Sequence, residues 1–168
     1  MWKEIQNAFK GTPSRLKVVK KMLELGFKVL PDGIYSGDVQ LSIVKLARAC
    51  GVDRKVVEET AKSIRETEFL SNIFGYLEPV ADISRIVKYN RSGFGGFIEI
   101  EAFSSSVGIA AKVATMISEE GLVIRYLLAK DPELSVDSTM TVVTDKPIPM
   151  HIISRLLEDP NIIRVSMS

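Results

Sequence analysis

The chain has 168 residues, of which 46% are hydrophobic and 26% are charged, proportions that are ordinary for globular domains. No run of eighteen apolar residues occurs and the start of the chain lacks the apolar core of a signal peptide, so we expect a cytoplasmic protein. The single cysteine, Cys50, excludes an internal disulfide and a multi-cysteine metal site.

The charges are distributed unevenly along the chain. Residues 1–66 contain 13 Lys and Arg against 8 Asp and Glu, whereas residues 67–168 contain 9 against 13. A basic front and an acidic back, each long enough for a small domain, indicate two modules with different partners.

The front of the chain predicts a helix followed by a hairpin. Thr12 caps a helix that has Pro13 at its first position, and its apolar face continues until Gly26. Residues 27–35 alternate around a Pro-Asp-Gly turn at 31–33, which predicts two short antiparallel strands.

Two further helices are expected between residues 39 and 66. The first ends at Gly51, and Asp53 is placed to cap the second. The expected apolar face of the first helix consists of Val39, Ile43, Leu46, Ala47 and Cys50, and that of the second consists of Val57, Ala61 and Ile64.

The spacing within this helix pair resembles the helix-turn-helix of many bacterial and archaeal regulators. Ala47 is a small residue where two helices would cross, Gly51 four positions later permits a tight turn, and Val57 falls ten positions after Ala47. In that geometry the start of the second helix enters the major groove of DNA. The resemblance implies Arg54 and Lys55 as base or phosphate contacts.

Basic residues beside that helix start would contact the DNA backbone, namely Lys45, Arg48 and Lys62. Glu58 and Glu59, expected to face outward on the same helix, would repel phosphates. The alternative is a three-helix domain that packs on a partner or on the C-terminal module.

Residues 67–93 predict a helical connector. Apolar residues recur with helical spacing over 68–77, before Pro79, and again over 83–89. Apolar faces imply packing, so a connector of this kind could transmit a ligand-dependent shift.

Residues 94–168 predict an α+β fold with the order strand, helix, strand, strand, helix, strand. The strands are expected at 97–102, 122–129, 140–144 and 162–167, and the helices end near Glu120 and Glu158. Ser104, Ser105 and Ser106 offer a cap for the first helix. Two short βαβ-type halves in about 75 residues fit a ferredoxin-like βαββαβ sandwich.

Several functions of that fold lack their residues here. The strand 140–144 has no aromatic side chain on which RNA bases could stack, and the first loop has neither a Cys-x-x-Cys metal pair nor a phosphate-binding arginine. The remaining feature is a loop of hydroxyls that leads into a helix.

That loop resembles the ACT domain family of amino-acid-sensing regulatory modules, in which the first strand runs into a Pro-Gly-hydrophobic helix start. The matching stretch reads Phe103-Ser104-Ser105-Ser106-Val107-Gly108-Ile109, and the Glu119-Glu120-Gly121-Leu122-Val123-Ile124 turn matches the entry to the second strand. The family often has proline where Val107 stands and asparagine where Val123 stands.

The resemblance implies a ligand site at residues 104–109 and a homodimer that forms through the ACT domain. Gly108 would let a ligand approach the backbone, amide groups at the helix start would attract a carboxylate, and serine hydroxyls would orient the amino group. Arg125 could hold a carboxylate, or it could be a solvated or interface charge. The alternative is that the serines only cap the helix and Gly108 only eases packing.

No residues favour an enzyme. The only histidine, His151, is expected on the surface, and Glu99 with Glu101 share a strand face without a metal or a pocket. We expect no cofactor and no metal site.

The whole chain resembles archaeal proteins described as predicted regulators of amino-acid metabolism, with an N-terminal helix-turn-helix domain at 1–66 and a C-terminal ACT domain at 94–168. The resemblance implies a transcriptional regulator that binds an amino acid and DNA. The alternative is an amino-acid-sensing subunit that acts on an enzyme without binding DNA.

Overall fold

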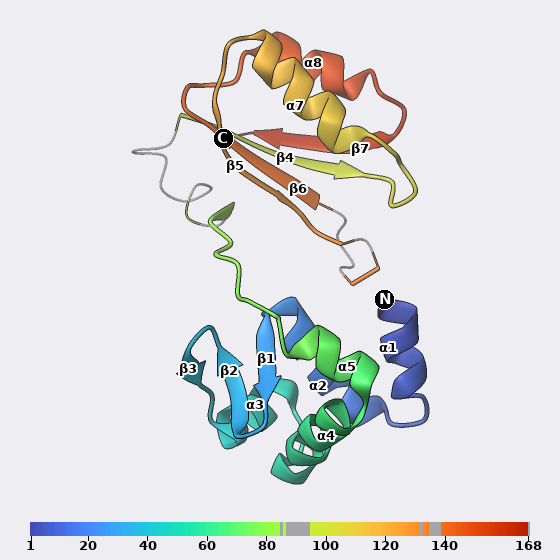
Figure 1. Cartoon of the computed structure of the whole chain (residues 1–168). Coiled ribbons are helices and arrows are strands. Elements are labelled where there is room, and N and C mark those ends of the chain that lie inside the picture. The colour runs from blue at the N-terminus through green and yellow to red at the C-terminus, as the bar shows by residue number, and fades with distance from the viewer. Residues whose placement is uncertain (85, 87–94, 132, 135–138, 168) are drawn as a thin grey trace. The chain divides into compact units, whose positions relative to one another are not determined.

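The computed structural model describes residues 1–84, 86, 95–131, 133–134 and 139–167, and the chain forms two compact units (Figure 1). Unit 1 is Met1–Ala81 and unit 2 is Asp82–Ser168. The α+β class is confirmed, because helices combine with two antiparallel sheets. Among the described residues no helix has the length and apolarity needed to span a membrane.

Unit 1 consists of five helices and a small sheet among its described residues. Its elements are α1 (Trp2–Ala8), α2 (Pro13–Glu24), β1 (Phe27–Leu30), β2 (Gly33–Ser36), β3 (Val39–Gln40), α3 (Ile43–Cys50), α4 (Arg54–Glu66) and α5 (Glu68–Phe74). α4 packs against α2, α3 and α5 because its apolar positions Val57, Ala61 and Ile64 recur at i, i+4 and i+7 and are all buried.

The expected start of the helix that ends at Gly51 is wrong. Val39 pairs with Ser36 in β3 and is 67% exposed, and the Leu41 N–H donates to the Ile34 carbonyl at 2.8 Å, which keeps this stretch extended. α3 begins only at Ile43, after the side chain of Ser42 caps it. Val39 therefore does not belong to the apolar face of the helix.

The segment that follows α4 is packed onto unit 1 as far as residue 79. α5 buries Leu70 and Phe74 and ends at Phe74, three residues before the expected end of that helix. The Lys28 Nζ atom then lies 2.8 Å from Glu78 Oε1, and a Cβ added at Gly26 would lie 2.3 Å from the Glu78 carbonyl oxygen. We call residues 75–81 the exit strap. The expected helix at 83–89 falls mostly outside the described residues.

Unit 2 has the predicted β-α-β-β-α-β order. Its elements are β4 (Gly96–Ala102), α7 (Ile109–Glu119), β5 (Ile124–Ala129), β6 (Thr139–Thr144), α8 (Met150–Leu157) and β7 (Ile162–Met167). The strands are paired antiparallel in the order β5-β6-β4-β7. Both helices cover one face of this sheet (Figure 1), where the core includes Ile98, Ile117, Val142, Ile152 and Leu156.

An ion pair joins α7 to the loop between α8 and β7. Lys112 Nζ lies 2.6 Å from Asp159 Oδ2, while Asp159 Oδ1 accepts the Asn161 N–H at 2.8 Å. The hydrogen bond from Lys112, with that from the Asn161 backbone, lowers the pKa of Asp159 below its ordinary value of 3.8.

We expect acid to weaken unit 2 through Asp159. Because its pKa is lower in the folded chain, the carboxylate stabilises the fold above the unfolded pKa, and this contribution is lost as the pH falls through the folded pKa. Urea midpoints measured at pH 7 and pH 3 should therefore differ less for Asp159→Asn than for the wild type. Glu158→Gln, an exposed neighbour, is the control, and equal pH dependence in all three proteins would contradict the expectation.

Candidate functional site

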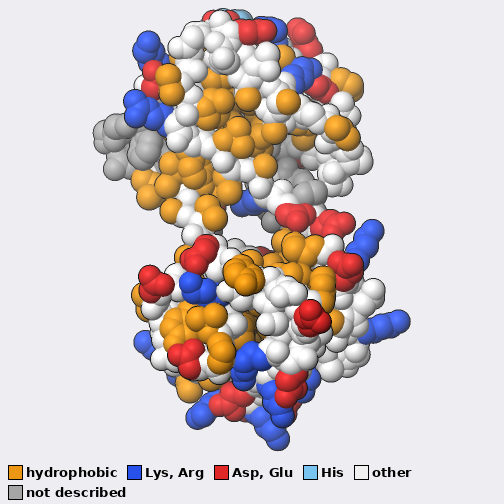
Figure 2. Space-filling model, viewed as in Figure 1, with side chains coloured by type: hydrophobic (Ala, Val, Ile, Leu, Met, Phe, Trp, Pro, Cys, Tyr) orange, Lys and Arg blue, Asp and Glu red, His pale blue; other side chains and the backbone are white. Residues whose placement is uncertain are grey.

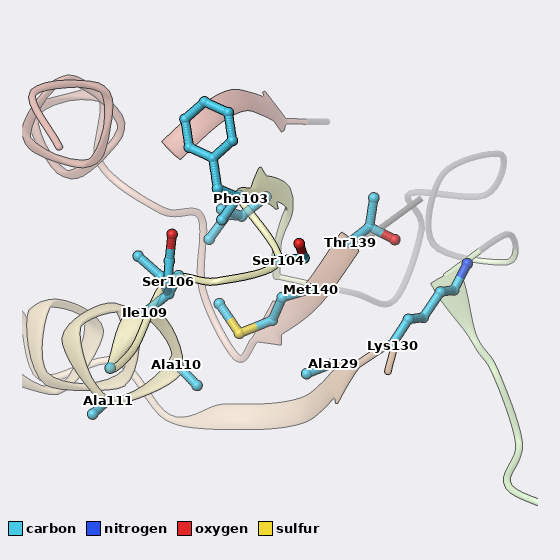
Figure 3. Close-up of a pocket in the computed structure, with 13 residues that line it drawn as sticks. Phe103, Ser104, Ser106, Ile109, Ala110, Ala111, Ala129, Lys130, Thr139 and Met140 are labelled. Carbon is cyan, nitrogen blue, oxygen red and sulfur yellow. The ribbon is translucent and has the colours of Figure 1, made fainter. Parts of the chain in front are cut away.

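A pocket of about 440 Å³ opens beside the serine loop of unit 2 (Figure 3). The end of β4, the start of α7, the end of β5 and the start of β6 meet there. The residues that line it are Ile100, Ala102, Phe103, Ser104, Ser106, Gly108, Ile109, Ala110, Ala111, Ala129, Lys130, Thr139 and Met140. Small-molecule sites commonly have volumes of about 300–1,000 Å³ and mostly apolar walls with a few polar groups, which this pocket also has.

The loop at the pocket is held by its own backbone. The Ser106 N–H donates to the Phe103 carbonyl at 2.9 Å, and Gly108 takes a left-handed conformation with φ of 82° at the N-cap of α7. No side chain caps this helix, so the expectation that the serine run supplies the cap is wrong. Gly108 occupies the N-cap position instead, and the first-turn amides keep their capacity to bind an acceptor.

Ser106 carries an unused polar atom at this pocket. Its Oγ is buried and has no hydrogen-bond partner among the described residues. A buried hydroxyl without a partner costs about 1–3 kcal/mol, so folded proteins rarely keep one without a reason. Its hydrogen-bonding capacity is unused among the described residues, and Ser106 is one of the residues that line the pocket.

The structure brings together some of the expected ligand residues and separates others. Ser104, Ser106, Gly108 and Ile109 line the pocket, whereas Ser105 does not. Val107 is also outside the lining and its side chain is 96% exposed.

Arg125 lies away from this pocket within the same chain. It is exposed near the start of β5, where the register shifts between Ile124 and Tyr126. The pocket is lined by Ala129, at the other end of that strand. At about 3.3 Å per residue the two ends are more than 10 Å apart.

Sequence reasoning missed the far rim of the pocket. Lys130 and Thr139 line it from the end of β5 and the start of β6, and the Lys130 N–H donates to the Thr139 carbonyl at 3.0 Å. The predicted βαββαβ order already contained the signal, because it brings the end of the second strand and the start of the third beside the start of the first helix.

The second candidate surface is the pair formed by α3 and α4. Gly51 ends α3 with φ of 64°, and the Val52 N–H donates to the Ala47 carbonyl at 3.0 Å. Asp53 Oδ1 accepts the Lys55 N–H at 2.8 Å and thereby caps α4. Ala47 and Val57 are both buried where the two helices pack, so the spacing read from the sequence corresponds to a compact helix-loop-helix.

Some basic residues of α3 and α4 form ion pairs with carboxylates, whereas others do not. Arg54 Nε lies 2.7 Å from Glu58 Oε1, and Lys62 Nζ lies 3.7 Å from Glu66 Oε1. Lys45, Arg48 and Lys55 are exposed and have no ion-pair partner among the described residues. Basic and acidic side chains are accordingly interspersed over this part of unit 1 (Figure 2).

Glu58 and Glu59, two of the three glutamates on α4, both form ion pairs. Glu59 forms an ion pair with Arg15 of α2, and Glu58 is held by Arg54. Their side chains are 40% and 42% exposed, so both face solvent as expected, but each charge is paired. Their repulsion of phosphates is correspondingly smaller.

Cys50 and His151, two other titratable residues that the sequence singles out, do not line the pocket of unit 2. Burial raises the pKa of the Cys50 thiol on α3, which disfavours the reactive thiolate. His151 is on the surface as expected, with Nε2 2.7 Å from Glu120 Oε1. Within the described ranges no three His, Cys, Asp or Glu side chains are placed to hold a metal ion.

No family model and no curated protein matches the chain in sequence. Among solved structures, an AsnC family transcriptional regulator from Agrobacterium tumefaciens is similar at 12% identity over 92% of this chain and 86% of that chain, with a TM-score of 0.28. A likeness this distant carries no weight for fold or function.

Proposed function

We propose that this protein is a transcriptional regulator that responds to an amino acid, with the ligand bound in the serine-loop pocket and DNA bound by the helix pair α3–α4. The observation that carries the proposal is the pocket itself, which adjoins uncapped helix amides and the buried, unpartnered Ser106 Oγ. An amino acid supplies a carboxylate for the amides and a donor for that hydroxyl oxygen.

The helix pair supports the DNA half of the proposal. Helix-turn-helix proteins insert the start of the second helix into the major groove, and here Lys55 is in the first turn of α4 with Arg48 on α3, both exposed. Lys45, Arg54 and Lys62 would contact phosphates around them. The domain limits of the proposal are 1–66 for DNA binding and 94–168 for the ACT domain, joined by the connector 67–93.

A homodimer formed through the ACT domain would connect the two activities. Ligand binding would favour one dimer state and so change the separation of the two helix pairs. Such coupling requires that the ligand bind the two states with unequal affinity.

A second candidate function is a regulatory subunit that senses an amino acid and acts on an enzyme without binding DNA. The ion pairs Arg54–Glu58 and Lys62–Glu66 favour it, because they reduce the positive charge that a DNA surface needs.

The test has two stages. Thermal shifts against the twenty amino acids identify a ligand, because binding to the folded state alone raises the melting temperature. Binding of genomic DNA fragments is then measured across salt concentration, with and without that ligand. A steep loss of affinity with salt supports the regulator, whereas no DNA binding at low salt leaves the subunit.

Ser106→Ala should separate ligand binding from folding. Removing the unpartnered hydroxyl should leave the ligand-free protein as stable as the wild type or slightly more stable, because a buried polar atom without a partner is lost. The same change should reduce the ligand-induced thermal shift. The exposed Ser105→Ala, outside the pocket lining, is the matched control and should keep the full shift. Equal shifts in both variants would remove Ser106 from the site.

A further inference from the structure

We propose that the pocket selects an acidic amino acid, whose side-chain carboxylate is bound by Lys130 while its α-carboxylate lies at the start of α7. The inference rests on the proposed function of the same pocket and adds the charge of the ligand to it.

The charges around the pocket are one-sided. Among the described lining residues there is one lysine, there are three hydroxyl side chains, and there is no aspartate or glutamate. The start of α7 adds partial positive charge from its uncapped amides. Every strong electrostatic feature of the described lining therefore favours an anion.

The two positive features lie at opposite rims. Figure 3 shows Ala110 and Ala111 on the first turn of α7 at one side of the pocket and Lys130 at the other, with Met140 and Ala129 between them and the Lys130 side chain extended away from Ala110. To meet a bound carboxylate, the flexible lysine stem turns its ammonium group back over the rim. A ligand that spans this distance can present one carboxylate to each rim. Its apolar middle would contact the alanine and methionine side chains that form the wall.

Lys130 lies at the rim of the pocket and has no ion-pair partner among the described residues. Its backbone is fixed by the hydrogen bond to the Thr139 carbonyl, and no carboxylate among the described residues forms an ion pair with it. The carboxylate of Asp131, its neighbour in sequence, accepts the Glu133 N–H at 2.8 Å and takes part in a turn.

The hydroxyl groups distinguish an amino acid from a simple dicarboxylate. The Ser106 Oγ can accept a hydrogen bond from an ammonium group, and without such a donor its acceptor capacity remains unused. An acidic amino acid satisfies this oxygen, the helix amides and Lys130 together.

Isothermal titration of the full chain tests the proposal with aspartate and asparagine, glutamate and glutamine, and succinate. Each amide matches the shape of its acid but lacks the side-chain charge. At least one acid should bind about tenfold more tightly than its amide, and more tightly than succinate, because a charge-assisted contact is lost in the amide. Lys130→Met should abolish the preference of acid over amide.

Lys146→Met is the matched control. Lys146 is exposed beyond the other end of β6 and is not in the pocket lining, so its loss should leave the preference unchanged. The selection for an acidic side chain is overturned if a neutral amino acid binds through Ser106 while neither acid does, or if Lys130→Met keeps the preference of acid over amide. Either result leaves the proposed amino-acid sensor in place. Succinate binding as tightly as the acids would overturn the amino-acid part, and no amino acid binding at all would end both proposals.

Discussion

Replacing Gly95 with alanine is expected to lower the free energy of unfolding by about 3 kcal/mol or more, which is a large part of the total for a small domain. A Cβ at Gly95 would lie 2.1 Å from the Asp145 carbonyl carbon and 2.2 Å from the Lys146 nitrogen. Both atoms belong to the backbone just after β6, so no side chain can move aside. β4 is a central strand, and displacing its start disturbs its pairing with β6.

Gly121→Ala is the control for this change. Gly121 has φ of 68° but open space around its Cβ position, so alanine there should cost only the conformational strain of about 1–2 kcal/mol. Urea denaturation of the full chain, followed by circular dichroism, compares the two variants. A Gly95→Ala protein that is as stable as Gly121→Ala would mean that the β4–β6 end adapts more readily than its backbone contacts indicate.

The second large effect is expected on DNA affinity, which basic and acidic substitutions on the helix pair should change in opposite directions. Arg48 and Lys55 are exposed and have no ion-pair partner among the described residues. The double variant Arg48→Ala with Lys55→Ala should therefore remove two phosphate contacts and make the negative slope of log affinity against log salt shallower by about 1.8. Glu58→Gln should instead strengthen binding, because it releases Arg54 from its ion pair. Fluorescence anisotropy with a labelled DNA fragment, at salt concentrations from about 50 to about 300 mM, measures both slopes.

Glu66→Gln is the informative partner variant. It releases Lys62 at the far end of α4 in the same way that Glu58→Gln releases Arg54 at the start. If α4 enters the groove by its N-terminal end, only Glu58→Gln should increase affinity strongly. Equal gains from both variants would indicate non-specific attraction, and no change from either would favour the subunit that does not bind DNA.

The sequence patterns predicted unit 2 well because its elements have clear local signals. The four strands, the two helices with an apolar face and Gly121 at a helix end are present as expected, and the β-α-β-β-α-β order follows from them. The elements of unit 1 were harder to predict from the sequence. α1 was missed although Trp2, Ile5 and Phe9 have helical spacing and are all buried.

The differences from expectation come from hydrogen bonds and an ion pair that the spacing of apolar residues does not show. Val39 is in a strand because β2 pairs with it, and Glu59 is neutralised because α2 brings Arg15 to it. The serine run does not cap α7, because Phe103–Ser106 forms a turn before the helix and Gly108 takes the N-cap position. Local pattern alone does not contain these contacts.

The exit strap has a practical consequence for dissecting the molecule. A fragment that stops at residue 66 would expose the side chains of α4 that Leu70 and Phe74 cover, and it would leave Lys28 without Glu78. An N-terminal fragment for spectroscopy or DNA binding should therefore extend to Ala81, and a protease site engineered for domain release belongs after that residue, not after Glu66.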